Sequence, residues 1–463
     1  MKVGKLSLLV LGAHLLAQTS YAGLDVSAPR GEATTHFKSP QGVTEVCIIP
    51  KKLSPSDFSD KDLKDEKELC SMDFYGIKSD AETPVPMITC PKQQSTNPAT
   101  LVGVLPAGMT KAQAEAKLCK GPHNDFDMEA KFKTSITCSY VPANLAYWQL
   151  SKMFQAGRVM PAVLRTFDAT EHEKIMNLGL QYSEGHAIEA SWKRIEKAEN
   201  AEPDLLYDTT RKTAYGALVK NLKKEAKYTV ISGVGVYDTR YERFLKQAPF
   251  LRVADGRSVP VLAQSDELKT IVSTAVQMKD VSDMILLDVL LSQEDRIGNM
   301  HVRYAWYWPE NGRMVSKVSK AKYNPDTKQP EIPKKELDMA KKSFLVREMY
   351  LKDNDCGVNV DKRTNMMRRY GVLEQVRHMS PETYKRFMQF AKIARNPETI
   401  KWLQTELLFR PIDVRGTKIS FLANVDFAAK TLLENCRSGL LKLDLNVDDY
   451  APGAKPTVQS CDI

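Results

Sequence analysis

The chain has 463 residues, of which 43% are hydrophobic and 27% are charged, and its formal net charge is +9 at pH 7. This length suffices for one large hydrophobic core or two smaller ones. The lysines and arginines form no dense stripe interleaved with aromatic residues, so the mild basicity does not indicate a nucleic-acid partner.

The N-terminus has the three parts of a secretory signal. Lys2 and Lys5 precede an apolar run at residues 6–16, and the segment ends in small residues up to Ala22. We therefore expect residues 1–22 to be a signal peptide, cleaved after Ala22, and the mature protein to be exported, periplasmic or secreted. No later stretch approaches the roughly 18 apolar residues of a membrane helix, so no transmembrane segment is expected.

The cysteine pattern agrees with export. All eight cysteines lie beyond the predicted signal peptide: Cys47, Cys70, Cys90, Cys119, Cys138, Cys356, Cys436 and Cys461. An even number favours disulfide bonds, and the lack of any CxxC pair gives a zinc site little support. Five cysteines precede residue 140 and three follow residue 350, so complete pairing requires at least one bridge between these two parts of the chain.

The first half of the chain begins with a segment of weak periodicity. Residues 23–125 are rich in Pro, Ser, Asp and Lys and predict a loop-rich region stapled by disulfides, with one helix at 110–119 capped by Thr110. Residues 128–136 predict a strand, 142–157 an amphipathic helix, and 159–167 another strand. Residues 187–227 read as a long polar helical stretch.

The second half is expected to be mostly helical. Apolar helices are predicted at 266–280, 281–292, 380–395 and 425–442. Strands at 300–308 and 313–319 flank the turn sequence PENG and predict a hairpin. The predicted fold class is α+β, with a smaller mixed N-terminal part and a larger, mainly helical C-terminal part.

The most informative segment is the polar loop QEDRIGN at 293–299, between an apolar helix and an aromatic strand. Asp and Asn a few residues apart in such a loop suit phosphoryl transfer. The Asp orients or deprotonates the attacking hydroxyl, and the Asn is an oxygen ligand for magnesium.

This loop resembles the D-R-x-x-(x)-N catalytic loop of atypical kinases, a group that includes phosphoinositide kinases, persistence-toxin kinases and secretory-pathway kinases that phosphorylate casein or xylose. The resemblance implies a two-lobed kinase-like fold, with Asp295 as catalytic base, Arg296 as its structural partner and Asn299 as a metal ligand. Many of those families place the Asn five residues after the Asp, whereas the interval here is four.

Two further segments resemble the same kinases. The strand before Asp353 resembles the one that delivers their second metal-binding acid, so Asp353, or Asp355 as the alternate, is the expected magnesium ligand. The strand EAKFKTSITC, followed by a helix and AGRVMPAVLR, implies that Lys133 or Lys131 holds the α- and β-phosphates of ATP. Asn144 stands where the family has the glutamate that pairs with this lysine.

Other acids are left open for that pairing role, and they are Glu129, Glu171, Glu173 and Glu184. No glycine-rich phosphate loop precedes the lysine, and the GVG at 233–235 lies on its wrong side. His301 is a candidate substrate contact on the strand that follows the loop.

The resemblance implies four divisions: a signal peptide at 1–22, the cysteine-containing region at 23–125, an N-lobe at 126–230 and a C-lobe at 231–463 with a basic insertion at 317–342. We expect an exported phosphotransferase that uses ATP with Mg²⁺ or Mn²⁺ on a hydroxyl of a protein or sugar. The alternatives are a non-catalytic binding or scaffold protein on a degenerate kinase-like fold, and a related enzyme that transfers AMP.

Overall fold

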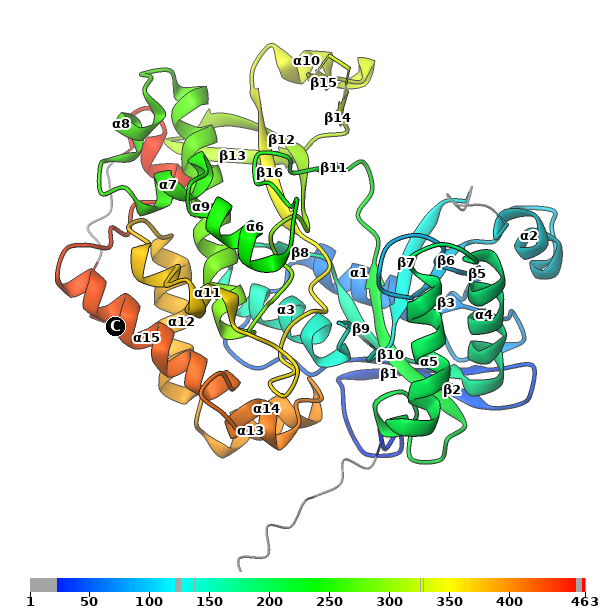
Figure 1. The fold of residues 1–463 in the computed structure, drawn as a ribbon. Coiled ribbons are helices and arrows are strands. Elements are labelled where there is room, and N and C mark those ends of the chain that lie inside the picture. The colour runs from blue at the N-terminus through cyan, green and yellow to red at the C-terminus, as the bar shows by residue number, and fades with distance from the viewer. Residues whose placement is uncertain are drawn as a thin grey trace, which may run out of the picture.

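The computed structural model describes residues 23–120, 126–136, 138–324, 326–327, 329–454 and 460–462. The predicted signal peptide lies outside these residues. Two large sheets, a small two-stranded sheet and a set of helices make up the described chain (Figure 1). Mixed strand and helix content confirms the α+β part of the predicted fold class.

The larger sheet has nine strands in the order β3-β5-β6-β7-β10-β9-β2-β1-β4. All of its pairs are antiparallel except β3 with β5. The strands are β1 Ala33–Lys38, β2 Thr44–Ile49, β3 Met72–Asp73, β4 Lys78–Ser79, β5 Val85–Pro91, β6 Thr100–Val104, β7 Met128–Lys133, β9 Ala162–Asp168 and β10 Thr213–Lys220.

The prediction of a loop-rich N-terminal region is therefore wrong. Residues 23–125 supply six of these nine strands and the helices α1 (Asp60–Cys70) and α2 (Lys111–Leu118). Short strands separated by charged turns lack the long periodicity on which the sequence analysis relied. The predicted helix at 110–119 is confirmed as α2, where Thr110 and Gln113 form a capping box.

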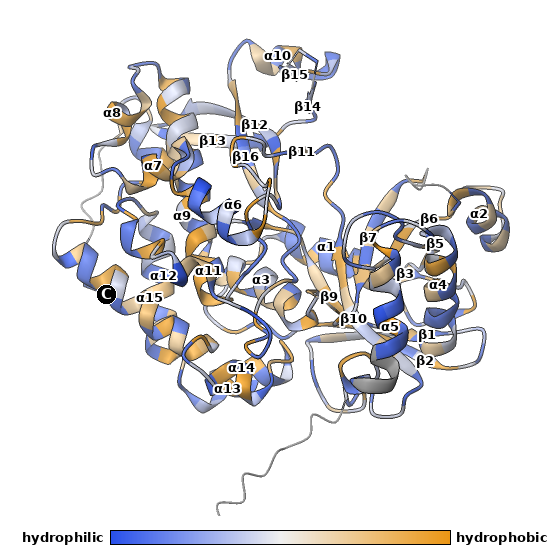
Figure 2. Ribbon diagram, viewed as in Figure 1, coloured by the Kyte–Doolittle hydropathy of each residue, from blue (hydrophilic) through white to orange (hydrophobic). Residues whose placement is uncertain are grey.

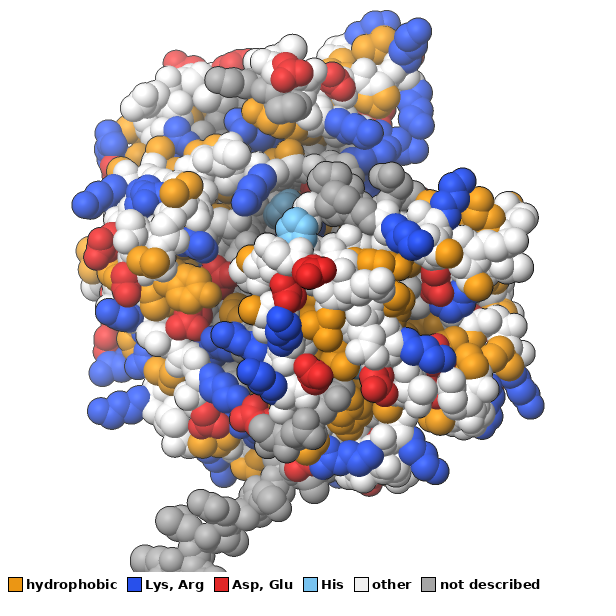
Figure 3. Space-filling model, turned by 45° about the vertical axis from the view of Figure 1, so that its right-hand side comes forward, with side chains coloured by type: hydrophobic (Ala, Val, Ile, Leu, Met, Phe, Trp, Pro, Cys, Tyr) orange, Lys and Arg blue, Asp and Glu red, His pale blue; other side chains and the backbone are white. Residues whose placement is uncertain are grey.

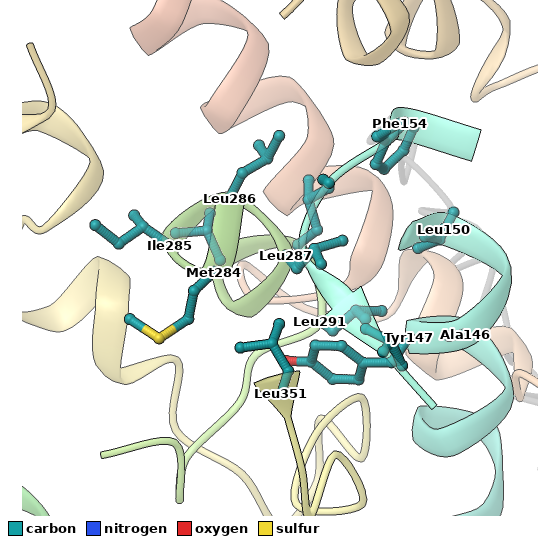
Figure 4. Packing of buried hydrophobic residues seen from close by; sticks show 14 of the residues in the cluster. Ala146, Tyr147, Leu150, Phe154, Met284, Ile285, Leu286, Leu287, Leu291 and Leu351 are labelled. Atoms are coloured by element: carbon teal, nitrogen blue, oxygen red, sulfur yellow. The ribbon is translucent and has the colours of Figure 1, made fainter. Parts of the chain in front are cut away.

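The helix α3 (Val141–Phe154) lies in the middle of the molecule, between the larger sheet and α9 (Leu268–Leu290). We expected an amphipathic helix, but every residue of α3 except Lys152 is buried. Figure 4 shows why, since Ala146, Tyr147, Leu150 and Phe154 pack toward the leucines of α9. The two helices predicted at 266–280 and 281–292 are this one continuous helix α9.

The smaller sheet has the order β11-β12-β16-β8, with β13 paired to β12. Its strands are β8 Arg158–Val159, β11 Ala226–Lys227, β12 Met300–Glu310, β13 Arg313–Val318 and β16 Phe344–Leu351. The predicted hairpin is confirmed, and its turn is formed by Asn311 and Gly312, both with positive φ. Beyond it, β14 (Lys322–Tyr323) and β15 (Pro330–Glu331) form a separate two-stranded sheet.

The polar stretch at 187–227 is not one long helix. It contains α5 (Glu189–Ala201), a 3-10 turn at Pro203–Leu205, and the central strand β10. The many lysines and glutamates around β10 led to the prediction of a polar helix there. Figure 2 shows α5 as largely hydrophilic, yet Trp192 is buried and its ring lies against Gly179 of α4 (Ala169–Tyr182). A second hydrophobic core fills the space between these helices and the larger sheet.

The remaining helices lie mostly on the other side of the molecule in Figure 1. They are α6 Tyr237–Phe244, α7 Ala248–Ala254, α8 Val259–Ala263, α10 Leu337–Ala340, α11 Met366–Arg369, α12 Pro381–Ile393, α13 Pro397–Thr405, α14 Pro411–Arg415 and α15 Phe421–Arg437, with 3-10 turns at Lys334–Glu336, Leu373–Gln375 and Val447–Tyr450. The helices predicted at 380–395 and 425–442 correspond to α12 and α15. No helix in the described ranges has the length and apolarity needed to cross a membrane.

All eight cysteines are paired. The disulfides are Cys47–Cys70, Cys90–Cys119, Cys138–Cys356 and Cys436–Cys461. The prediction that at least one bridge joins the part before residue 140 to the part after residue 350 is confirmed by Cys138–Cys356, which spans 218 residues.

Candidate active site

Lys133 is the last residue of β7 and the centre of the candidate site. Its side chain is only 7% exposed, and its Nζ lies 3.1 Å from Asp353 Oδ1 and 3.1 Å from Asp355 Oδ2. Burial by itself would lower the pKa of Lys133, but the two carboxylates outweigh that effect and raise it. Lys133 is therefore a firmly charged ammonium, and the two acids neutralise it.

The two acids belong to a short segment directly after β16. Asp353 has φ of +49°, a left-handed conformation that Asp adopts more readily than most residues. Burial opposes its ionisation, but Lys133, Lys92, Lys131 and Lys352 together hold its pKa well below the usual range. Asp355 is buried, and its second oxygen, Oδ1, has no hydrogen-bond partner among the described residues.

A buried arginine ties the polar loop to this acid segment. Arg296 is fully buried; its Nε donates to both oxygens of Asp288 on α9, its Nη1 to the Lys352 carbonyl and its Nη2 to Asn354 Oδ1. Tyr147 of α3 donates its hydroxyl proton to Asp288 at 2.6 Å. One buried network therefore fixes α3, α9, the loop and the end of β16 relative to one another.

Asp295, the candidate base, lies beside this network with its carboxylate 22% exposed. Its Oδ1 accepts a hydrogen bond from Arg240 of α6 at 2.8 Å. Burial raises the pKa of Asp295 to about 6, even though Arg240 acts in the opposite direction. The partner of Asp295 is thus Arg240, which the sequence analysis did not single out, and Arg296 pairs with Asp288 instead.

Asn299 closes the polar loop, since its side-chain Nδ2 donates to the Asp295 carbonyl at 2.6 Å. Its backbone carbonyl accepts from the Lys352 N–H, which joins the loop to the acid segment a second time. His301, the candidate substrate contact, has its Nδ1 3.4 Å from Glu225, and the same carboxylate pairs with Lys352.

The lysine has no acid partner on α3. Asn144 is 5% exposed, lines the same cavity as Lys131 and Lys133, and its Nδ2 has no partner among the described residues. None of the acids considered as replacements pairs with Lys133. Glu129 pairs with Lys223, and Glu171 with Lys174. Asp353 and Asp355 take this role.

Two more lysines, Lys131 and Lys92, lie near enough to the acids for the carboxylate charges to act on them, and neither has an ion-pair partner in the described part of the chain. Burial and the neighbouring Lys352 lower the pKa of Lys131 to about 8. Burial also lowers the pKa of Lys92, whose Nζ donates to the Asn97 carbonyl at 3.1 Å. Charged groups in such enclosed positions are normally paired, so the two lysines together mark a place for an anion.

Lys92 comes from a loop that the sequence analysis overlooked. Residues 92–99 connect β5 to β6, which is the neighbour of β7 in the sheet, and the Lys92 N–H closes the turn by donating to the Ala99 carbonyl. Two side-chain hydrogen bonds anchor the loop. Trp192 Nε1 donates to the Lys92 carbonyl, and the buried Gln93 side chain donates to the Cys119 carbonyl. The loop contains no glycine, so no sequence motif marks it.

The GVG segment lies beside the polar loop. The backbone of Gly233 packs against Gly298, and a Cβ on Gly233 would approach the Gly298 Cα to 2.4 Å. Glycine is required at both positions for this close approach. The segment therefore supports the loop of Asp295 and does not reach the lysines.

The donor chemistry of the acid segment fits a hard divalent cation. Mg²⁺ typically takes one or two protein carboxylates and completes its shell with water and phosphate oxygens. Asp353 and the unpartnered Oδ1 of Asp355 provide that type of donor. No group of three or more His, Cys, Asp or Glu side chains close enough for a metal occurs among the described residues.

No protein-family model matches the chain, and no curated protein matches it. Four solved chains match, among them the crystal structure of the Golgi casein kinase. That structure is 13% identical, covers 77% of this chain and 73% of its own, and superposes with a TM-score of 0.36.

Proposed function

We propose that this protein is an exported, kinase-like phosphotransferase that moves the γ-phosphate of ATP to a hydroxyl of a protein or sugar. The observation that carries the proposal is the ion pairing of Lys133 with Asp353 and Asp355 next to the Asp295 loop. Phosphoryl transfer needs a phosphate-binding lysine, a loop Asp at the acceptor hydroxyl and further oxygen ligands for a metal.

In this proposal Lys133, Lys131 and Lys92 bind the phosphates, and Asp353, Asp355 and Asn299 hold Mg²⁺ or Mn²⁺. A bound metal would neutralise charge on the phosphate oxygens. Asp295 accepts the proton of the acceptor hydroxyl, and Arg240 holds its carboxylate in place. Arg296 is a positioning residue that acts through Asp288 and Asn354.

Ligand binding requires a rearrangement at Lys133. The cavity lined by Lys131, Lys133 and Asp353 has about 30 Å³ of free space, enough for one or two water molecules. The ammonium of Lys133 stands between the two acids where a metal cation would otherwise neutralise them. We infer that Lys133 exchanges at least one carboxylate for a phosphate when the nucleotide binds.

The two-lobed organisation belongs to the same proposal, with an N-lobe at 126–230 and a C-lobe at 231–463. The larger sheet crosses the boundary at residue 125, so we infer that residues 23–125 fold together with the N-lobe. Four disulfides favour an oxidising compartment and therefore export.

The direct test is thermal unfolding of the mature chain, with its disulfides intact, in ATP with and without Mg²⁺ or Mn²⁺. A ligand that binds the native state raises the melting temperature. We expect a metal-dependent rise that Asp353→Ala abolishes and that Asp338→Asn, on exposed α10, retains. Phosphate transfer to an acceptor should then require Asp295.

A non-catalytic binding protein is the competing function, and one observation favours it. Lys133 lacks an acid partner on α3, where Asn144 stands, and both of its carboxylate partners are the proposed metal ligands. Absence of any metal-dependent rise with ATP would contradict the phosphotransferase and leave this second function.

A further inference from the structure

A second polar groove lies away from the candidate active site. Its free volume is about 460 Å³, within the range of small-molecule sites. The first turns of α9, the odd-numbered face of β16, Tyr228 and the tip of the β14–β15 hairpin line it. Arg347 lies on β16, whereas Asp353 follows the end of that strand six residues later, so the two sites are at most about 20 Å apart along the chain.

Three cations from three different elements face this groove: Arg252 of α7, Lys269 of α9 and Arg347 of β16. None of them forms an ion pair with a described carboxylate. The single carboxylate in the lining, Asp280, is already engaged by Arg158 and by the Met349 N–H. The groove therefore carries uncompensated positive charge.

The floor of the groove also presents an oriented hydrogen-bond donor. Arg252 Nη1 donates to Gln277 Oε1 at 2.5 Å, which directs the Gln277 amide nitrogen toward Tyr228, where it donates to the hydroxyl oxygen at 2.7 Å. The Tyr228 hydroxyl thus accepts one bond, and its own proton has no acceptor among the described residues. Burial raises the pKa of Tyr228 to about 12, so the proton is retained at physiological pH.

The remaining lining suits the non-ionic part of a small ligand. Leu345 and Met349 alternate with Arg347 on one face of β16, and Tyr304 lies across the strand pair from Arg347. The Thr270 and Ser273 side chains line the α9 side of the groove. An anion with an attached organic group could meet the cations and the Tyr228 hydroxyl at one end and apolar surface at the other.

Figure 3 shows Lys and Arg side chains gathered at the upper edge of the molecule, where β14, β15 and α10 project. Seven lysines of the basic insertion that the structure describes are exposed and contribute charge to this region: Lys317, Lys320, Lys322, Lys334, Lys335, Lys341 and Lys342. Positive potential of this kind raises the local concentration of anions near the groove.

We propose that this groove is a binding site for a small phosphorylated molecule, separate from the proposed ATP site. A phosphate dianion matches two arginines and a tyrosine hydroxyl better than a single carboxylate does, since arginine binds phosphate through two parallel hydrogen bonds. The volume favours a sugar phosphate or a nucleoside monophosphate over a folded partner. This inference does not depend on the proposed function.

The test is calorimetric titration of the mature chain with inorganic phosphate, glucose 6-phosphate and AMP, at constant ionic strength. At least one of these should bind, and Arg252→Gln and Arg347→Gln should each weaken its binding about tenfold or more. Tyr228→Phe removes one donor without changing the charge and should also weaken binding. Arg313→Gln, on exposed β13 outside the groove, is the matched control and should bind like the wild type.

Lys133→Met separates this site from the proposed active site. Retained binding in Lys133→Met, together with loss in the groove variants, supports the inference. Loss of binding in Lys133→Met with retained binding in the groove variants would place the ligand at the lysines of the candidate active site and overturn the inference. Failure of every probe to bind at millimolar concentration would overturn it as well. If Arg252→Gln does not fold, Arg347→Gln and Tyr228→Phe decide the result, because Arg347 is exposed and phenylalanine has nearly the same shape as tyrosine.

Discussion

Asp295 is an acid whose surroundings oppose its charge. Its pKa is raised from 3.8 to about 6 by burial, although Arg240 lies 2.8 Å away. A general base must be ionised to accept a proton, and a pKa close to the working pH is favourable for that role. The low pKa of Asp353 keeps that residue ionised throughout the same range.

We therefore predict that kcat/KM of the phosphotransferase rises with pH through about 6 and reaches a plateau above it. Asp295→Asn should lower kcat by about 10² to 10⁴, the usual contribution of a general base. Steady-state kinetics between pH 5 and 8 measure both effects. A pH-independent kcat/KM in this range would contradict the assignment of Asp295.

Stability provides the control for Asp295→Asn. Because the pKa is raised on folding, Asp295 favours the native state below about pH 4, and this contribution is lost as pH rises through about 6. Asparagine resembles the protonated acid, so at pH 7.5 the variant should unfold at no lower temperature than the wild type. Loss of activity with unchanged stability then shows that Asp295 acts in the reaction and not only in folding.

Lys131 should show a trade-off between stability and binding. Its pKa of about 8 lies below the ordinary 10.5, so the unfolded chain holds the proton more tightly, and native stability rises with pH between 8 and 10.5. At pH 7 the enclosed charge is therefore a cost. We predict that Lys131→Met raises the melting temperature of the ligand-free protein and weakens ATP binding about 10- to 100-fold.

Thermal unfolding with and without ATP and Mg²⁺ measures both quantities for Lys131→Met. Lys317→Met, on an exposed position of β13, is the matched control and should change neither. A Lys131 variant that loses stability and keeps ATP affinity would show that the lysine serves the fold alone.

At the scale of secondary-structure elements, the Arg296–Asp288 pair joins α9 to the end of β16. Both side chains are fully buried, and Tyr147 of α3 shares the Asp288 carboxylate. Removal of one partner from a buried pair leaves an uncompensated charge. We predict that Arg296→Met lowers the free energy of unfolding by about 3–5 kcal/mol.

Urea unfolding measures this loss. Arg313→Met on the exposed strand β13 should change stability by less than about 0.5 kcal/mol. The double variant Arg296→Met with Asp288→Asn should recover part of the loss, because the unpaired carboxylate is gone. Equal losses in the single and double variants would contradict a direct interaction.

At the scale of the whole molecule, the disulfide Cys138–Cys356 connects the segment after Lys133 to the segment that carries Asp353 and Asp355. It spans 218 residues, whereas Cys436–Cys461 spans 25. Cross-linking a longer loop removes more entropy from the unfolded chain. The long bridge should also maintain the geometry of the site, which the C-terminal bridge does not touch.

We predict that replacing Cys138 and Cys356 by Ser lowers the free energy of unfolding by about 5 kcal/mol, against about 3–4 kcal/mol for Cys436 and Cys461. The first variant should also lose the ATP-dependent rise in melting temperature under conditions where it stays folded. Denaturant unfolding and ligand titration measure the two effects. Equal ATP binding in both variants would exclude a role of the long bridge at the site.

Much of the local structure followed from the sequence. Thr110 begins α2, the Asn311–Gly312 turn closes a hairpin, and the strand at 128–133 ends on Lys133. These features depend on neighbouring residues, because caps, turns and strand alternation act over a few positions. The central strand β10 was missed, since its burial comes from strands distant in the sequence.

Part of the candidate site could likewise be predicted from the sequence alone. The order of Lys133, Asp295 and Asp353 indicated residues that the fold brings close to one another, because each stands at the end of a strand or in a short polar loop. Spacing alone could not identify Arg240 as the partner of Asp295, nor Asp288 as the partner of Arg296. Those pairings depend on how α6 and α9 pack.

The order of residues along the chain by itself determined that the fold is mixed and that a disulfide joins the part before residue 140 to the part after residue 350. Only the tertiary structure decided which cysteines pair, that residues 23–125 complete the larger sheet, and that Lys92 of the β5–β6 loop lies near enough to Asp353 and Asp355 for their charges to act on it. The reason is physical. Local propensities act over a few residues, whereas burial and charge pairing depend on contacts between segments hundreds of positions apart.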